Sequence, residues 1–257
     1  MMNMKEIIKY VIISLVQGFT EPLPISSSGH MLITKNLLGV ESNELTLEIF
    51  LNFSSMLAIL FFMFTKRLNF KETITNISLL GKIIIASIPT IIIGFFVKNY
   101  IENTALSIFY IGISLLVTTI FLFISSYFIN RTKILEINHF NALSLGFSQS
   151  VALIPGISRM GTVMTCGLIS GINIKKILDF SFLMYLVVSS GSLVLSIPNL
   201  LNLNKDLLLY YSISFLVTMV TTYFSINWFY NVINKKSLIG FGVYTLILGT
   251  LLIKIGL

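Results

Sequence analysis

Charge, cysteine and histidine are the features this sequence has least of. Only 11% of its 257 residues are charged, against about 25% in ordinary soluble domains. The single cysteine, Cys166, excludes an intramolecular disulfide and a zinc cage built from cysteines. Two histidines, His30 and His139, form no HExxH pattern, and no P-loop is present. These absences exclude zinc hydrolases and P-loop nucleotide enzymes.

The sequence contains long apolar runs in place of charged residues. The chain is 55% hydrophobic, and its mean hydropathy is +0.93. Apolar runs of about 20 residues, the length that an α-helix needs to cross a bilayer, recur throughout. We therefore expect an all-α polytopic protein of the cell membrane, with one integral membrane domain over residues 1–257. Lys5 and Lys9 precede no small-residue cleavage site, so no removable signal peptide is expected.

Six segments are long enough to span the membrane, and two further apolar regions are interrupted. The predicted spans are residues 46–64, 79–98, 105–128, 177–196, 207–230 and 238–256. The interrupted regions, about 5–38 and 139–171, are broken by EPLPISSSGH and IPGISRMG. Their arms are too short to cross a bilayer, so each region is predicted to be a re-entrant helix–loop–helix. Irregular backbone at that depth must be covered by protein or line a cavity.

The two halves, approximately residues 1–130 and 131–257, share one order of elements: a broken hairpin and then three spans. At one constant offset they also share residue types, in the pairs Pro24 with Pro155, Ser27 with Ser158, and Glu48 with Asp179. Three spans per half is an odd number, so the second repeat is predicted to be inverted in the membrane. The two broken loops would then meet near the membrane midplane.

The net charge of +7 is explained by topology, so no nucleic-acid partner is expected. Loops on one side hold Lys66, Arg67, Lys71, Arg131, Lys133, Lys175, Lys176, Lys235 and Lys236. Only Glu72 and Glu136 oppose them there. The positive-inside rule makes this side cytoplasmic. Both termini and the mouth of the first hairpin are therefore expected outside.

The first break places polar groups in an order that suits anion binding. Gln17 and Glu21 lie four residues apart and share one helix face. Pro22 and Pro24 end that helix, because proline lacks an N–H donor and restricts the residue before it. The serines at 26–28 can cap the next helix. A helix N-terminus there presents unpaired N–H groups and a partial positive charge.

The second break repeats this pattern. Pro155 and Gly156 end one helix, Ser158 caps the next, and Arg159 falls in its first turn. Arginine is suited to phosphate because it donates two parallel hydrogen bonds. A serine or a histidine could act as nucleophile, and histidine could equally serve as acid or base. The two breaks together indicate a phosphate site inside the membrane.

Taken in order, QGFTEPLPISSSGH and PGISRMGT resemble the undecaprenyl-diphosphatase family of the bacitracin-resistance type. The hydropathy pattern is similar over nearly the whole chain. This resemblance implies hydrolysis of undecaprenyl diphosphate to undecaprenyl phosphate and phosphate, which recycles the lipid carrier of cell-wall synthesis and confers bacitracin resistance. It also implies dependence on a divalent cation, Mg²⁺ or Ca²⁺, and an active site that opens to the outer face.

The resemblance assigns roles to individual residues. The implied catalytic set is Glu21, Ser27, His30 and Arg159, with Glu21 also the metal ligand and the choice of Ser27 or His30 as nucleophile left open. The implied substrate-binding set is Gln17, Ser26, Ser28, Gly29, Gly156, Ser158 and Thr162. The chain departs from the family pattern where Gln17 replaces glutamate, Met160 replaces serine and Val163 replaces threonine.

Other interpretations of the same residues stay open at this point. Glu21 could be a structural carboxylate paired with Arg159. Opposed broken helices are also used by secondary transporters, so a lipid or small-molecule transporter or flippase is the main alternative. The type-2 phosphatidic acid phosphatase fold is disfavoured, because it needs a histidine shortly after the arginine and residues 160–172 contain none. The expected partners are the polyprenyl diphosphate and membrane lipids, and a homodimer is left open.

Overall fold

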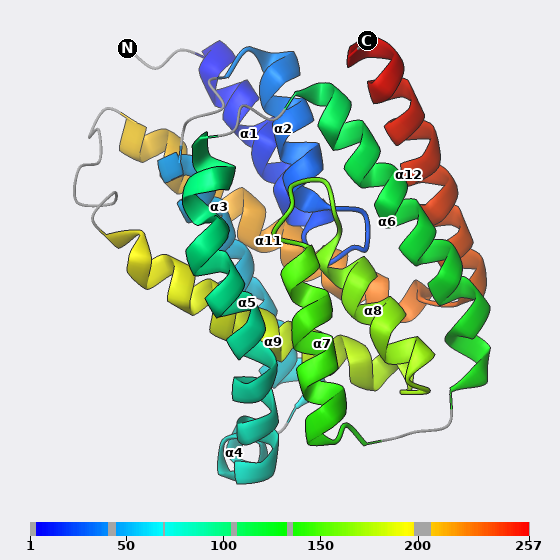
Figure 1. Ribbon diagram of the computed structural model, residues 1–257. Helices are drawn as coiled ribbons and strands as arrows, with labels where there is room; N and C mark the ends of the chain where they lie inside the picture. Colours follow the sequence, from blue (N-terminus) through cyan, green and yellow to red (C-terminus); the bar gives the residue numbers. More distant parts are fainter. Residues whose placement is uncertain are drawn as a thin grey trace.

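The computed structural model describes residues 4–40, 45–68, 70–103, 107–132, 136–197 and 207–256, and within these ranges it is helical without a β-strand. The first half contains α1 (Met4–Thr20), α2 (Ser27–Leu38), α3 (Leu45–Phe62), the π-helical turn η1 (Met63–Arg67), α4 (Phe70–Thr75), α5 (Ile77–Asn103) and α6 (Ile108–Phe128). After the 3₁₀ turn η2 (Ile129–Arg131) come α7 (His139–Val151), α8 (Arg159–Ile169), α9 (Ile174–Leu195), α11 (Leu208–Val232) and α12 (Lys235–Gly256) (Figure 1).

Six of these helices are long and apolar enough to cross a membrane. They cover Leu47–Arg67, Ile77–Val97, Ile108–Arg131, Ile174–Leu195, Leu208–Val232 and Lys235–Gly256. The prediction of an all-α multi-pass membrane protein is thereby confirmed, with each predicted span matched by one helix. The turn η1, which forms the end of the first span, and the short helix α4, which follows that span, were not predicted.

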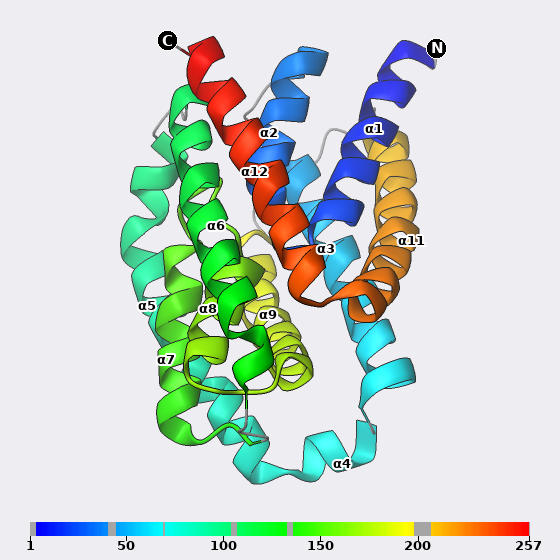
Figure 2. The ribbon, with the colours of Figure 1, turned by 90° about the vertical axis from the view of Figure 1, so that its right-hand side faces the viewer.

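The two interrupted regions form helical hairpins with short arms. Helices α1 and α2 have 17 and 12 residues, and α7 and α8 have 13 and 11. At about 1.5 Å per residue, none of them crosses a hydrocarbon core of about 30 Å. The α1–α2 hairpin enters from the end where both termini lie, and α7–α8 enters from the end where α4 lies (Figures 1 and 2). An inverted repeat requires opposed hairpins of this kind, and the equivalence of the two halves stays a prediction.

The tips of the two hairpins touch, and glycine makes this contact possible. A Cβ atom on Gly29 would lie 3.2 Å from the Cα of Gly156. Gly156 has φ +91°, a conformation that side chains rarely adopt, and its N–H donates to the Ser28 hydroxyl at 3.3 Å. A larger residue at Gly29 would press against the second loop, and one at Gly156 would press against α6.

Close helix packing surrounds the hairpins. Helix α12 packs along α6, α11 packs along α1 and α3, and α7 packs along α5. Small residues allow this approach: a Cβ on Gly112 would lie 2.8 Å from the carbonyl oxygen of Gly249, and one on Gly146 would lie 2.1 Å from that of Ala86. Such contacts are typical of helices that associate in membranes. The spanning helices therefore hold both hairpin arms in fixed positions.

Candidate active site

A cavity of ≈ 350 Å³ lies where the two hairpin tips meet. This volume is within the range of small-molecule sites, about 300–1,000 Å³. Both loops line it, together with residues of α3, α5, α7 and α9. Its polar lining includes Glu21, Ser26, Ser27, Ser28, Asn52, Thr90, Gln149, Ser158, Arg159 and Tyr185.

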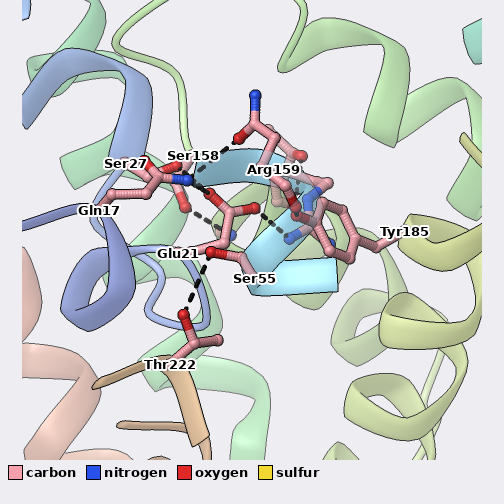
Figure 3. A network of polar contacts seen from close by, with 11 residues as sticks. Gln17, Glu21, Ser27, Ser55, Ser158, Arg159, Tyr185 and Thr222 are labelled. Atoms are coloured by element: carbon pink, nitrogen blue, oxygen red, sulfur yellow. Dashed lines mark hydrogen bonds and ion pairs between the residues drawn. The ribbon is translucent and has the colours of Figure 1, made fainter. Parts of the chain in front are cut away.

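Glu21 is the centre of a hydrogen-bond network at this cavity. Its side chain follows the last residue of α1 and is 8% exposed. One carboxylate oxygen accepts from the Ser27 hydroxyl at 2.5 Å and from the Gln17 amide at 3.1 Å. The other accepts from Nη2 of Arg159 at 3.1 Å. Figure 3 shows Gln17, Ser27 and Arg159 all directed at this carboxylate, so the buried charge is compensated from three sides.

Ser27 and Glu21 have the geometry of a nucleophile and its base. A hydroxyl becomes a useful nucleophile when a neighbouring group within hydrogen-bond reach accepts its proton. Ser27 begins α2, so its hydroxyl also lies at a helix N-terminus, where the partial positive charge favours a phosphate. Gln17, which the family pattern often replaces with glutamate, donates to Glu21 and also to Asn52 at 3.1 Å. A glutamate there would place a second negative charge beside Glu21.

Arg159 begins α8 and keeps part of its guanidinium for a ligand. Nη2 pairs with Glu21, and the guanidinium carbon lies 4.2 Å from the centre of the Tyr185 ring. Nη1 is buried and has no hydrogen-bond partner within the described part of the chain. The ion pair between Glu21 and Arg159, which was the structural alternative for Glu21, is therefore present. It uses only one edge of the guanidinium. The other edge is a charged donor on a residue that lines the cavity, and a bound anion would supply its missing acceptor.

His30 lies behind the first loop and is not among the residues that line the cavity. Its Nδ1 is 2.7 Å from the carbonyl oxygen of Ser26, and its Nε2 is 2.7 Å from the Tyr244 hydroxyl. The two rings also stack, with centroids 5.6 Å apart. Both ring nitrogens therefore have partners, and the geometry favours Ser27 over His30 as the nucleophile.

The remaining predicted binding residues divide into those that line the cavity and those that support it. Ser26 caps α2 by accepting from the Gly29 N–H at 3.3 Å, and Ser158 caps α8 by accepting from the Gly161 N–H at 3.1 Å. Both line the cavity, as does Ser28. The supporting residues, which are not among the lining ones, are Gln17, Gly29, Gly156 and Thr162. Thr162 donates instead to the carbonyl oxygen of Arg159 at 2.9 Å.

Sequence reasoning missed seven polar lining residues: Asn52, Thr90, Gln149, Tyr185, Ser189, Ser192 and Ser196. They come from four different helical segments, and no local motif marks them. The available signal was the rarity of polar side chains inside predicted spans, where they are usually functional. Gln149 also lies only five residues before the second break, on the arm that leads into it.

The cavity offers oxygen ligands for a cation but no preformed cluster of charged ones. Among the described residues, no three His, Cys, Asp or Glu side chains gather in one place. The lining does bring together the Glu21 carboxylate, the Asn52 amide and the Ser27 hydroxyl. Such oxygen groups suit Mg²⁺ or Ca²⁺, and Mg²⁺ is often held by one or two carboxylates together with substrate phosphates. The residues therefore fit a cation that arrives with a phosphorylated ligand.

The fold is that of a multi-pass membrane protein, and a polar cavity lies at the contact of its two short helical hairpins. Residues 10–251 match the family model described as "Bacitracin resistance protein BacA", and the chain belongs to this family. "Undecaprenyl-diphosphatase 1" of Bacillus cereus (strain ATCC 14579) is 36% identical over 95% of this chain and 96% of its own. "Undecaprenyl-diphosphatase 1" of Bacillus licheniformis is 34% identical over 96% and 97%. "Undecaprenyl-diphosphatase" of Oceanobacillus iheyensis is 32% identical over 98% and 97%.

Proposed function

We propose that this protein hydrolyses undecaprenyl diphosphate to undecaprenyl phosphate and inorganic phosphate. Family membership and the names of its relatives support this substrate. The structural observation that carries the chemistry is the Ser27–Glu21 pair beside an arginine with a free buried donor. Recycling of the cell-wall lipid carrier and bacitracin resistance belong to the same proposal.

The diphosphate binds between the two hairpin tips. Nη1 of Arg159 donates to an oxygen of the terminal phosphate, and the serine hydroxyls of both loops offer further donors. The N-termini of α2 and α8 both begin at this cavity, so their partial positive charges add to that of the arginine. This binding mode uses groups that need no rearrangement of the hairpins.

Phosphoryl transfer begins at Ser27. Its oxygen forms a bond to the terminal phosphorus while the bond from that phosphorus to the bridging oxygen breaks. Glu21 takes the serine proton and passes it to the leaving undecaprenyl phosphate. Arg159 stabilises the charge on the transferred group, which is the main task of a protein in such reactions. Water then releases phosphate from the phosphoserine.

A divalent cation, Mg²⁺ or Ca²⁺, belongs to this proposal as a partner of the substrate. Glu21 and Asn52 would hold it together with oxygens of the diphosphate. When bound, it would neutralise part of the substrate's negative charge. His30 has a positioning role in this account, because its ring holds the carbonyl of Ser26 from behind.

The site opens toward the outer half of the membrane. Its walls come from the first residues of α3, such as Ile49, and from the end of α9, where Ser192 lies in the last turn and Ser196 is the C-cap. By the positive-inside rule, these helix ends lie opposite the basic cytoplasmic loops. A homodimer stays a prediction.

The test is phosphate release from undecaprenyl diphosphate by the purified protein in detergent, with Mg²⁺, Ca²⁺ or EDTA. No leaflets exist in detergent, so transport cannot contribute to the signal. We expect release that EDTA suppresses and that Ser27→Ala abolishes. Ser170→Ala is the matched control, because its hydroxyl only donates to the carbonyl of Cys166 within α8. A folded wild-type protein that released no phosphate would favour the transporter.

A further inference from the structure

Two buried side-chain atoms without a hydrogen-bond partner belong to residues that line the cavity. They are Nη1 of Arg159, a donor, and Oε1 of Gln149, an acceptor. The other such atoms in the described ranges, in Ser181 and Ser214, belong to residues that do not line it. Leaving a buried polar atom unpaired costs stability, so each needs an explanation. A phosphate oxygen explains the arginine but cannot satisfy an unpaired acceptor.

The amide nitrogen of Gln149 makes the hydrogen bond that holds this side chain in place. The side chain is 2% exposed, and its Nε2 donates to the Thr90 hydroxyl at 3.4 Å. The Thr90 hydroxyl in turn donates to the carbonyl oxygen of Gly146 at 3.3 Å, one turn before Gln149 on α7. Gly146 lies against the backbone of Ala86, which fixes α7 close to α5. The nitrogen side is thus anchored to α5, and no described residue donates to the oxygen.

We propose that Gln149 orients the water molecule that hydrolysis consumes, an inference that rests on the proposed function. Water is the one reactant at this site that must present a donor to an acceptor. The water oxygen forms a bond to the phosphorus of the phosphoserine while the bond from phosphorus to the Ser27 oxygen breaks. The departing proton passes through Glu21 to the Ser27 oxygen. The amide oxygen accepts a hydrogen bond without taking the proton, as glutamine does for the attacking water in some nucleotide hydrolases.

The experiment compares Gln149→Met with Ser214→Ala in the phosphate-release assay. Both variants remove an unpaired buried polar atom, but only the first removes it from the cavity. We expect kcat of Gln149→Met to fall about 100-fold, the usual scale for a group that acts only in the chemical step. Its KM should stay within about twofold and its melting temperature should not fall, because the orphaned atom is gone and the volume is nearly kept. Phosphoserine 27 should accumulate during turnover. Ser214→Ala should keep wild-type kcat and KM.

Four results would overturn this assignment. A higher KM with unchanged kcat would mean that the amide binds the diphosphate, with its NH₂ group turned to the substrate. An unchanged kcat and KM would remove any role in the reaction. A lower melting temperature, with kcat lost in parallel, would make Gln149 a structural residue. A folded wild-type protein without phosphate release would refute the proposed function itself, and this inference with it.

Discussion

Ser26 has the one positive φ, 72°, found for a residue other than glycine in the part of the chain that the structure describes. Such a backbone conformation persists only where its surroundings hold it, and it often occurs at functional sites. Here the Ser26 carbonyl is fixed by His30, which in turn is fixed by Tyr244 on α12. This chain of contacts orients the three serines whose side chains line the cavity.

Removing the Tyr244 hydroxyl should therefore reduce turnover. We expect Tyr244→Phe to lower kcat roughly tenfold, because one hydrogen bond of about 1 kcal/mol that orients the loop is lost. Tyr110→Phe, on the exposed side of α6, is the matched control and should change nothing.

His30→Asn, which keeps a donor for the Ser26 carbonyl, should retain more activity than His30→Ala. Equal inactivity of both His30 variants would favour histidine as the nucleophile.

Sequence reasoning reached the residues that sit in the two breaks. Glu21, Ser27 and Arg159 stand in motifs where proline, glycine and serine mark the backbone, so their meeting could be predicted. Asn52, Gln149 and Tyr185 come from separate helices, and their approach depends on packing across the bundle. The contact between His30 and Tyr244 could not be predicted either, because the two residues are 214 positions apart in the sequence.

At the scale of elements, the site exists because two short hairpins can touch. Gly156 is required in the second loop for two reasons, its backbone conformation and its close approach to α6. Its φ is +91°, and a Cβ there would lie 2.6 Å from the Cβ of Ser114 on α6. Thr118, one turn further along α6, donates to the Gly156 carbonyl at 3.1 Å and accepts from the Ser158 N–H at 3.0 Å. Helix α6 is thus the support on which the second loop is built.

Gly156→Ala should destabilise the protein and displace the second loop from α6. We expect a loss of about 1–3 kcal/mol from backbone strain alone, with the clash against Ser114 adding to it. Gly39→Ala is the control, because Gly39 also has a positive φ, 61°, but has nothing within 4 Å of its Cβ position. Thermal unfolding in detergent measures both variants. Equal loss of melting temperature in the two would contradict the proposed tight fit of the second loop against α6.

At the scale of the whole molecule, the apolar runs predicted the number and order of the spans well. Length and hydropathy decide whether a helix crosses the membrane, and both are properties of one continuous segment of sequence. Apart from the pair of Glu21 with Arg159, the ion pairs between elements were not predicted. Lys35 pairs with Glu48 at 2.6 Å, and Arg67 pairs with Asp179 at 3.0 Å. Glu48 and Asp179 occupy matched positions of the two predicted repeats, yet their partners come from unmatched positions, which a repeat alignment cannot indicate.

Membrane orientation is the whole-molecule prediction to test. In a Cys166→Ser background, Lys254→Cys should react with a membrane-impermeant maleimide added to intact cells, because the C-terminal end of α12 is expected outside. Lys66→Cys should react only after permeabilisation. Both lysines are exposed, so access to reagent differs only through topology. The reverse labelling pattern would place the cavity on the cytoplasmic side.

The central claim is that Arg159 and the Ser27–Glu21 pair form one catalytic site, and one comparison tests it most directly. Phosphate release from undecaprenyl diphosphate in detergent is measured for wild type, Arg159→Ala and Arg131→Ala. Both arginines lie over a tyrosine ring, Arg159 over Tyr185 and Arg131 over Tyr127, but only Arg159 lines the cavity. The account predicts that Arg159→Ala loses at least about 100-fold in kcat/KM, as expected when a charged group that stabilises phosphoryl transfer is removed, while Arg131→Ala keeps wild-type activity. Wild-type activity in a folded Arg159→Ala variant would contradict it.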